Sequence, residues 1–143
     1  MKAIPAVAVL AAGLITSGGA FAADPPDLVG TWKAVPGTYA SVRLGDDNDY
    51  HPEHKTPSFG GPDEAWSLTI ESQNGRAFVG RAESPKGKGE PVVGVVSFDG
   101  TRLIMAADEA GLFGTIDGNQ IEICYQDQED DRSGVSCYVA QKQ

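Results

Sequence analysis

Closely spaced turns that contain glycine are the feature of this sequence that most constrains its fold. After residue 28 they divide the chain into segments of about five to eight residues in which apolar and polar side chains tend to alternate. No window of a dozen residues here carries apolar positions at the helical period without an interrupting glycine or proline. The pattern predicts an all-β chain with strands at 28–35, 39–44, 65–71, 76–82, 91–98, 101–107, 112–116, 119–126 and 135–141.

The register of each hairpin follows from the requirement that apolar side chains share one face. That requirement favours a three-residue loop at 73–75, a two-residue turn at 99–100, a four-residue loop at 108–111 and a two-residue turn at 117–118. The pairs expected from these loops are Ile70 with Phe78, Val96 with Leu103, Leu103 with Ile116, and Leu112 with Ile123.

Five successive strands then share one apolar face, made of Phe98, Leu103, Met105, Leu112, Ile116, Ile121, Ile123 and Tyr125. Such a meander of eight or nine antiparallel strands closes most simply as an up-and-down β-barrel, which leaves no exposed edge. A two-sheet β-sandwich is the alternative. Three glycines on the inward face, Gly80, Gly94 and Gly114, either let the strands curve or leave room for an apolar ligand.

The two cysteines of the chain, Cys124 and Cys137, fall on the last two predicted strands. Pairing these strands so that the cysteines face each other also puts Ile123 opposite Tyr138 on the inner face. The register therefore predicts a disulfide on the outer face, worth on the order of 3 kcal/mol in an oxidising compartment. A redox-active pair or a zinc site is the weaker interpretation, because the chain has no Cys-x-x-Cys motif.

The N-terminal segment is typical of a secretory signal peptide. Lys2 precedes an apolar run from 3 to 16 that is too short to span a bilayer of about 30 Å, and Ala20-Phe21-Ala22 offers small residues for cleavage. We expect a signal peptide at 1–22 and a single soluble domain at 23–143, located in the periplasm or secreted.

An excess of acidic residues restricts the partners of the chain. It has 20 acidic and 11 basic residues, for a formal net charge of −9. A surface of this sign repels nucleic acid and anionic membranes, and it attracts cations or basic proteins. The predicted interior brings together no pair of carboxylates and no Ser–His–Asp set, so the sequence does not predict an enzyme.

The segment 45–64 is the one long interruption between predicted strands. Its acidic and imidazole side chains are candidate ligands for calcium or zinc: Asp46, Asp47, Asp49, His51 and His54. Their spacing does not match a zinc-protease helix, and the glycine and terminal glutamate of an EF-hand are missing. A solvated acidic loop, or a loop that docks a basic protein partner as an inhibitor or assembly factor does, is the alternative.

The motif Gly30-Thr31-Trp32 resembles the Gly-x-Trp opening of lipocalin- and avidin-type barrels, the calycin group, whose tryptophan closes one end of the barrel. The chain departs from the lipocalin pattern in lacking an arginine on the last strand, and it carries no biotin site. It also resembles, in part, the small secreted barrels that inhibit bacterial metalloproteases, although its cysteines come late in the chain. We therefore expect a small apolar or amphipathic ligand in the barrel mouth, near Trp32, Trp66, Tyr125 and Tyr138.

Overall fold

The computed structural model describes residues 24–44, 57–61, 66–84, 86–108, 110–128 and 133–143, and these residues contain strands but no helix. Accordingly, this part of the chain has no helix that could span a membrane. The strands are β1 (Gly30–Ala34), β2 (Ala40–Leu44), β3 (Ser58–Gly60), β4 (Ser67–Asn74), β5 (Ala77–Glu83), β6 (Gly89–Val96), β7 (Arg102–Ala106), β8 (Ala110–Asp117), β9 (Gln120–Gln128) and β10 (Ser133–Lys142).

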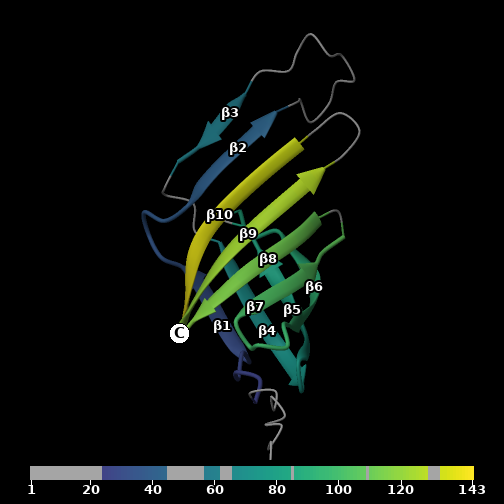
Figure 1. The fold of residues 1–143 in the computed structure, drawn as a ribbon. Coiled ribbons are helices and arrows are strands. Elements are labelled where there is room, and N and C mark those ends of the chain that lie inside the picture. Colours follow the sequence, from purple (N-terminus) through teal and green to yellow (C-terminus); the bar gives the residue numbers. More distant parts are fainter. Residues whose placement is uncertain (1–23, 45–56, 62–65, 85, 109, 129–132) are drawn as a thin grey trace, which may run out of the picture.

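All neighbouring strands are antiparallel, and the order β1-β4-β5-β6-β7-β8-β9-β10 closes on itself because β1 also pairs with β10 (Figure 1). The predicted up-and-down barrel is confirmed, and the sandwich alternative is excluded. The last strand, β10, is shared: its C-terminal part pairs with β1 and its N-terminal part with β2. The sheet thus continues past one end of the barrel through β2 and β3.

Strand β3 was not predicted, since it lies inside the expected loop 45–64. It has three residues, of which Phe59 is the one apolar side chain, and Phe59 points to solvent. A strand this short shows no alternation, so the sequence carries no periodic signal for it.

Two predicted registers are confirmed. Val96 pairs with Leu103 across the 99–100 turn, and Cys124 pairs with Cys137, with Ile123 opposite Tyr138. The two sulfur atoms form the predicted disulfide, and no described cysteine is free.

Three other registers were wrong, each by two residues. Ile70 pairs with Gly80, Leu103 with Gly114, and Leu112 with Tyr125. Because a shift of two residues keeps each side chain on the same face, the inward and outward assignments survive the error.

Turns that lie at other positions than expected explain these shifts. Gly75 and Gly118, with φ of 57° and 60°, each begin a two-residue turn that is centred later in the chain than the expected loop. A bulge between Ile70 and Ser72 then reduces the resulting shift of the β4–β5 register by one residue. In the third case the Ala107 N–H donates to the Ala110 carbonyl oxygen at 3.0 Å, which closes the β7–β8 turn early.

The barrel interior is packed by apolar side chains from every strand of the barrel. Of the predicted inward set, Leu103, Met105, Leu112, Ile121 and Ile123 are buried, and Ile116 and Tyr125 pack against them. Phe98 was wrongly placed inside. It is 60% exposed because β6 ends at Val96, and Phe98 lies in the following turn, where alternation no longer applies.

The inward glycines make room for neighbouring atoms of the protein. A Cβ at Gly94 would overlap the Phe78 ring, and one at Gly80 would overlap the Thr69 carbonyl oxygen. These two glycines therefore allow close packing, and they leave no space at their positions for a ligand deep in the barrel.

Residues 24–29 lie across one end of the barrel, which we call the closed end. The Leu28 N–H donates to Gln73 Oε1 at 2.9 Å, Gln73 Nε2 donates to the Pro26 carbonyl at 2.9 Å, and Trp32 Nε1 donates to the Leu28 carbonyl at 2.9 Å. On the last strand, where the sequence has no arginine, the Lys142 ammonium lies 5.6 Å from the centre of the Trp32 ring.

Candidate functional site

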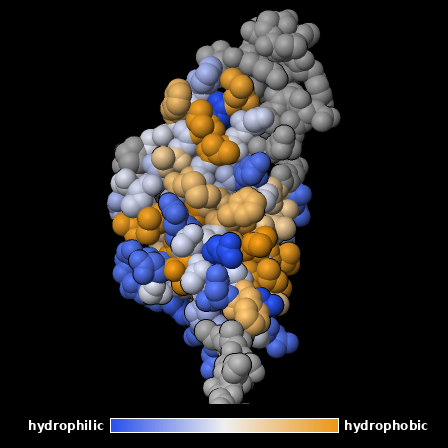
Figure 2. All heavy atoms as spheres, viewed as in Figure 1, coloured by the Kyte–Doolittle hydropathy of each residue, from blue (hydrophilic) through white to orange (hydrophobic). Residues whose placement is uncertain are grey.

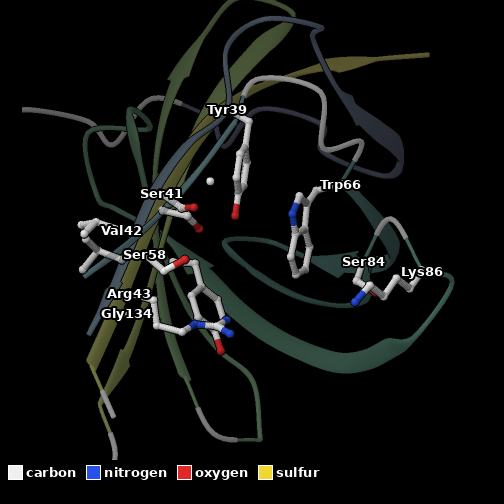
Figure 3. A pocket seen from close by; sticks show the side chains of 13 residues that line it. Tyr39, Ser41, Val42, Arg43, Ser58, Trp66, Ser84, Lys86 and Gly134 are labelled. Atoms are coloured by element: carbon white, nitrogen blue, oxygen red, sulfur yellow. The ribbon is translucent and has the colours of Figure 1, made fainter. Parts of the chain in front are cut away.

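A hollow of about 360 Å³ lies at the opposite end of the barrel, which we call the mouth (Figure 3). Its lining comes from the sheet extension, from the segment before β4 and from the β5–β6 connection. The lining residues described are Tyr39, Ser41, Val42, Arg43, Ser58, Gly60, Trp66, Ser84, Lys86, Tyr125, Gly134, Val135 and Ser136.

Tyr39 is positioned by the turn that separates β1 from β2. Gly37 has a φ of 83°, and Thr38 ties this turn to the barrel, since its hydroxyl donates to the Val35 carbonyl at 2.7 Å and accepts the Val139 N–H at 3.1 Å. Past this turn the chain changes from pairing with the end of β10 to pairing with its beginning. Tyr39, at the change, is buried and faces the hollow.

Trp66 forms the facing wall. Its carbonyl oxygen accepts the Ala34 N–H at 2.8 Å, which fixes the backbone just before β4. In Figure 3 the rings of Tyr39 and Trp66 stand side by side across the opening. Tyr125, which lines the hollow from β9 opposite Ser136 of β10, adds a third aromatic ring.

The polar groups of the hollow are hydroxyls and two cations. Ser41 lies in register with Ser136 of β10, and Arg43 lies in register with Ser58 of β3. Figure 3 shows Arg43 on the side of Tyr39 and Lys86 on the side of Trp66. The described lining contains no carboxylate and no imidazole. Three aromatic rings beside several hydroxyls suit a ligand with an apolar body and a polar edge.

The structure brings two of the four predicted ligand-binding residues to this site, namely Trp66 and Tyr125. Trp32 is 1% exposed, its indole N–H is bonded to the Leu28 carbonyl at the closed end, and it does not line the hollow. Tyr138 is buried behind Tyr39, with the two ring centres 6.4 Å apart. Burial, together with the neighbouring Tyr39, raises the pKa of the Tyr138 phenol well above its usual value.

Sequence reasoning missed the contribution of β2 and of the β5–β6 connection. Tyr39, Ser41 and Arg43 alternate along one face, so the pattern alone could have grouped them. The pattern does not show that, near Thr38, the pairing moves from the end of β10 to its beginning. This move turns that face toward the mouth.

The proposed metal ligands Asp46, Asp47, Asp49, His51 and His54 lie outside the described residues, as does most of the loop proposed to dock a partner. Elsewhere, the described part of the chain contains no cluster of three or more side chains of the types that bind metals. Calcium and zinc binding therefore stay predictions of the sequence.

Comparisons of the chain with protein-family models, with curated proteins and with solved structures find no significant match. The calycin-type resemblance is thus carried by the closed antiparallel barrel of eight strands and by the position of Trp32 at one end of it.

Proposed function

We propose that this chain is an exported binding protein that holds one small amphipathic ligand in the mouth of a calycin-like barrel. The observation that carries the proposal is the hollow of about 360 Å³, walled by Tyr39, Trp66 and Tyr125 at the end of a barrel that is otherwise packed. Its volume lies near the lower limit of about 300 Å³ for small-molecule sites.

The packing of the barrel supports a position for this ligand at the mouth. Because the Phe78 ring and its neighbours fill the interior, the ligand stays above the core. Its apolar part contacts the three aromatic rings, and its polar part meets the serine hydroxyls and the cations at the rim. We infer that the ligand is short or has a compact ring system, since a long chain would need a deeper cavity.

Export fits the same picture. The Cys124–Cys137 disulfide is consistent with an oxidising compartment, and the N-terminal sequence is typical of a signal peptide. We propose the periplasm or the external medium as the place of function.

Two fluorescent probes that differ in one group test the proposal: N-phenyl-1-naphthylamine, which is neutral, and 1-anilinonaphthalene-8-sulfonate, which carries a negative charge. We expect both to bind, and we expect Trp66→Ala to weaken both by about tenfold or more, because it removes one aromatic wall. Lys86→Gln should weaken the sulfonate probe by about threefold and leave the neutral probe unchanged.

The matched control is Phe113→Ser, which removes an aromatic side chain from the outer face of the barrel. Probe binding that falls in Phe113→Ser but not in Trp66→Ala would place the apolar site on the outside of the barrel and refute the proposal. Native mass spectrometry of the purified protein then shows whether a ligand remains bound to it.

A further inference from the structure

The outer face of the barrel carries apolar side chains where a soluble barrel normally carries polar ones. Five of them lie on β5 to β8 and are each between 44% and 57% exposed. We call this set the apolar wall; it consists of Val79, Val93, Val95, Ile104 and Phe113. Figure 2 shows apolar side chains reaching the surface in the part of the molecule where Figure 1 shows β7 and β8.

The strand registers make the apolar wall one continuous surface. Val79 lies directly opposite Val93, Val95 opposite Ile104, and Ile104 opposite Phe113. The next residue along that row is Cys124, whose disulfide lies on the same face. Directly opposed side chains in a sheet have Cβ atoms about 5 Å apart, so these contacts form an unbroken patch. Contiguous apolar patches of this kind mark interaction surfaces, whereas scattered apolar residues do not.

Charged residues border the patch in a self-complementary way. Thr115 of β8 pairs with Arg102 of β7 on one side and with Glu122 of β9 on the other. Since strands lie about 4.8 Å apart, the two charges sit at nearly equal distances on either side of β8. A two-fold axis that runs parallel to β8, just above its outer face, would therefore place Arg102 of each copy against Glu122 of the other.

From this arrangement we propose that the β8 side of the apolar wall, around Ile104 and Phe113, binds a second copy of this chain and forms a two-fold symmetric dimer centred on β8. Phe113 lies close to the axis and contacts its equivalent. Ile104 faces Cys124 of the second copy, beside a shallow hollow of about 300 Å³ on this face. An interface of this type uses the same patch on both copies, which requires the pairing of opposite charges that β7 and β9 supply.

Arg102 can serve this contact while keeping its neighbour in the chain. Its guanidinium lies 3.5 Å from an oxygen of Asp99, and both side chains are more than half exposed. An exposed pair of this kind is worth little by itself, and a guanidinium has five N–H donors, so a second carboxylate can be bound. The convex wall limits the contact to about four strands, and the dimer is accordingly expected to dissociate on dilution.

Sedimentation equilibrium over a range of protein concentrations tests the dimer. We expect the mature chain to be dimeric at high concentration, and Phe113→Ser to shift the dissociation constant upward by about tenfold or more. The matched control is Phe98→Ser, because Phe98 is also aromatic and exposed but lies in the turn between β6 and β7, outside the row of paired strand residues that forms the apolar wall. It should leave the dimer unchanged.

Exchange of the two charges tests the geometry. Arg102→Glu and Glu122→Arg should each weaken the dimer by about tenfold, because each single change sets two like charges against each other across the interface. The double variant should regain most of the loss, since the pair is then again of opposite sign. Thermal unfolding will show whether Phe113→Ser folds. If it does not, the charge substitutions, which are exposed, still test whether the dimer forms through this face.

Three results would overturn the proposal. One is a wild-type chain that stays monomeric at every concentration. Another is a dimer that the double charge exchange does not restore, which would mean a different interface. The last is a monomer whose apolar wall instead binds neutral lipid vesicles or a different protein in a manner that depends on Phe113. Trp66→Ala, which alters the mouth alone, should remain dimeric, so failure here and failure of ligand binding are distinguishable.

Discussion

The two ends of the barrel each present a tryptophan, and the two side chains are used in opposite ways. At the closed end Trp32 is covered by residues 24–29 and by Lys142, and its indole N–H is bonded to the Leu28 carbonyl. At the mouth Trp66 is half-buried and forms one wall of the hollow that the described residues enclose. The same residue type thus completes the core at one end and borders a cavity at the other.

The polar groups of the two ends also differ: those at the closed end are bonded within the protein, and those at the mouth line the hollow. At the closed end, the amide of Gln73 bonds to the backbone of both Leu28 and Pro26, so the covering segment is held within the fold. At the mouth, the hydroxyls of Ser41, Ser58 and Ser136 line the hollow. Polar groups that are hydrogen-bonded within the protein stabilise the fold, whereas polar groups that line a hollow can bond to a ligand. The closed end thus stabilises the fold, and the mouth is where we propose that a ligand binds.

The largest expected effect separates the two tryptophans. Trp32→Ala should lower the free energy of unfolding by about 3–5 kcal/mol, because it removes a large buried side chain. Trp66→Ala should cost no more than about 1.5 kcal/mol, since part of its ring already faces solvent. Urea unfolding followed by far-UV circular dichroism measures both.

Trp32→Phe provides a milder version if the alanine variant does not fold, and its loss of stability should still exceed that of Trp66→Ala. Equal losses at the two positions would contradict the division between the two ends.

Removal of the disulfide should have the next largest effect. The double variant Cys124→Ala, Cys137→Ala should lose about 3 kcal/mol of unfolding free energy, because the closed loop of the β9–β10 hairpin no longer restricts the unfolded chain. Tyr125 and Ser136, the immediate neighbours of the two cysteines, line the mouth. Probe binding should therefore weaken as well, by about threefold or more.

Isothermal denaturation and a probe titration of the same variant check both effects. Undiminished probe binding by a variant that has lost the expected stability would show that the strand pairing alone positions the mouth.

The sequence predicts the strands of the barrel better than the two ends of the barrel. Inward and outward positions follow from alternation, which is why Leu103, Ile121 and Ile123 were placed correctly even where the register was two residues off. Alternation fixes a face but does not fix how far one strand slides along the next in steps of two. Turn glycines such as Gly75 and Gly118 decide that, through left-handed conformations that several loop lengths can accommodate.

The mouth was predicted only in part, because some of its residues come from connections between strands, which have no period. Trp66 and Tyr125 stand out by residue type, whereas Ser84 and Lys86 belong to a connection between strands. Tyr39 joins the site through a change of strand pairing, which is a long-range event that no local pattern encodes. Core positions are set by local alternation, and site positions are set by where distant segments meet.

The smallest expected effect concerns a turn at the closed end. The Asp99 carboxylate accepts hydrogen bonds from the Ser97 hydroxyl and from the N–H and hydroxyl of Thr101, and these bonds, with Arg102 nearby, hold its pKa well below the usual range. A carboxyl whose pKa is lowered by folding stabilises the protein above its unfolded pKa of about 4, and this stabilisation is lost as the pH falls below that value.

Asp99→Asn should therefore lower the melting temperature slightly at pH 7, and the difference from wild type should shrink progressively below pH 4. Ser97→Ala, which removes one of these hydrogen bonds, should shift the same loss toward higher pH, because the carboxyl then binds its proton more readily. Thermal unfolding at a series of pH values measures both variants. A difference between wild type and Asp99→Asn that is independent of pH would mean that the turn depends on the shape of the side chain and not on its charge. The charge of Asp99 would then contribute nothing to the stability of the closed end.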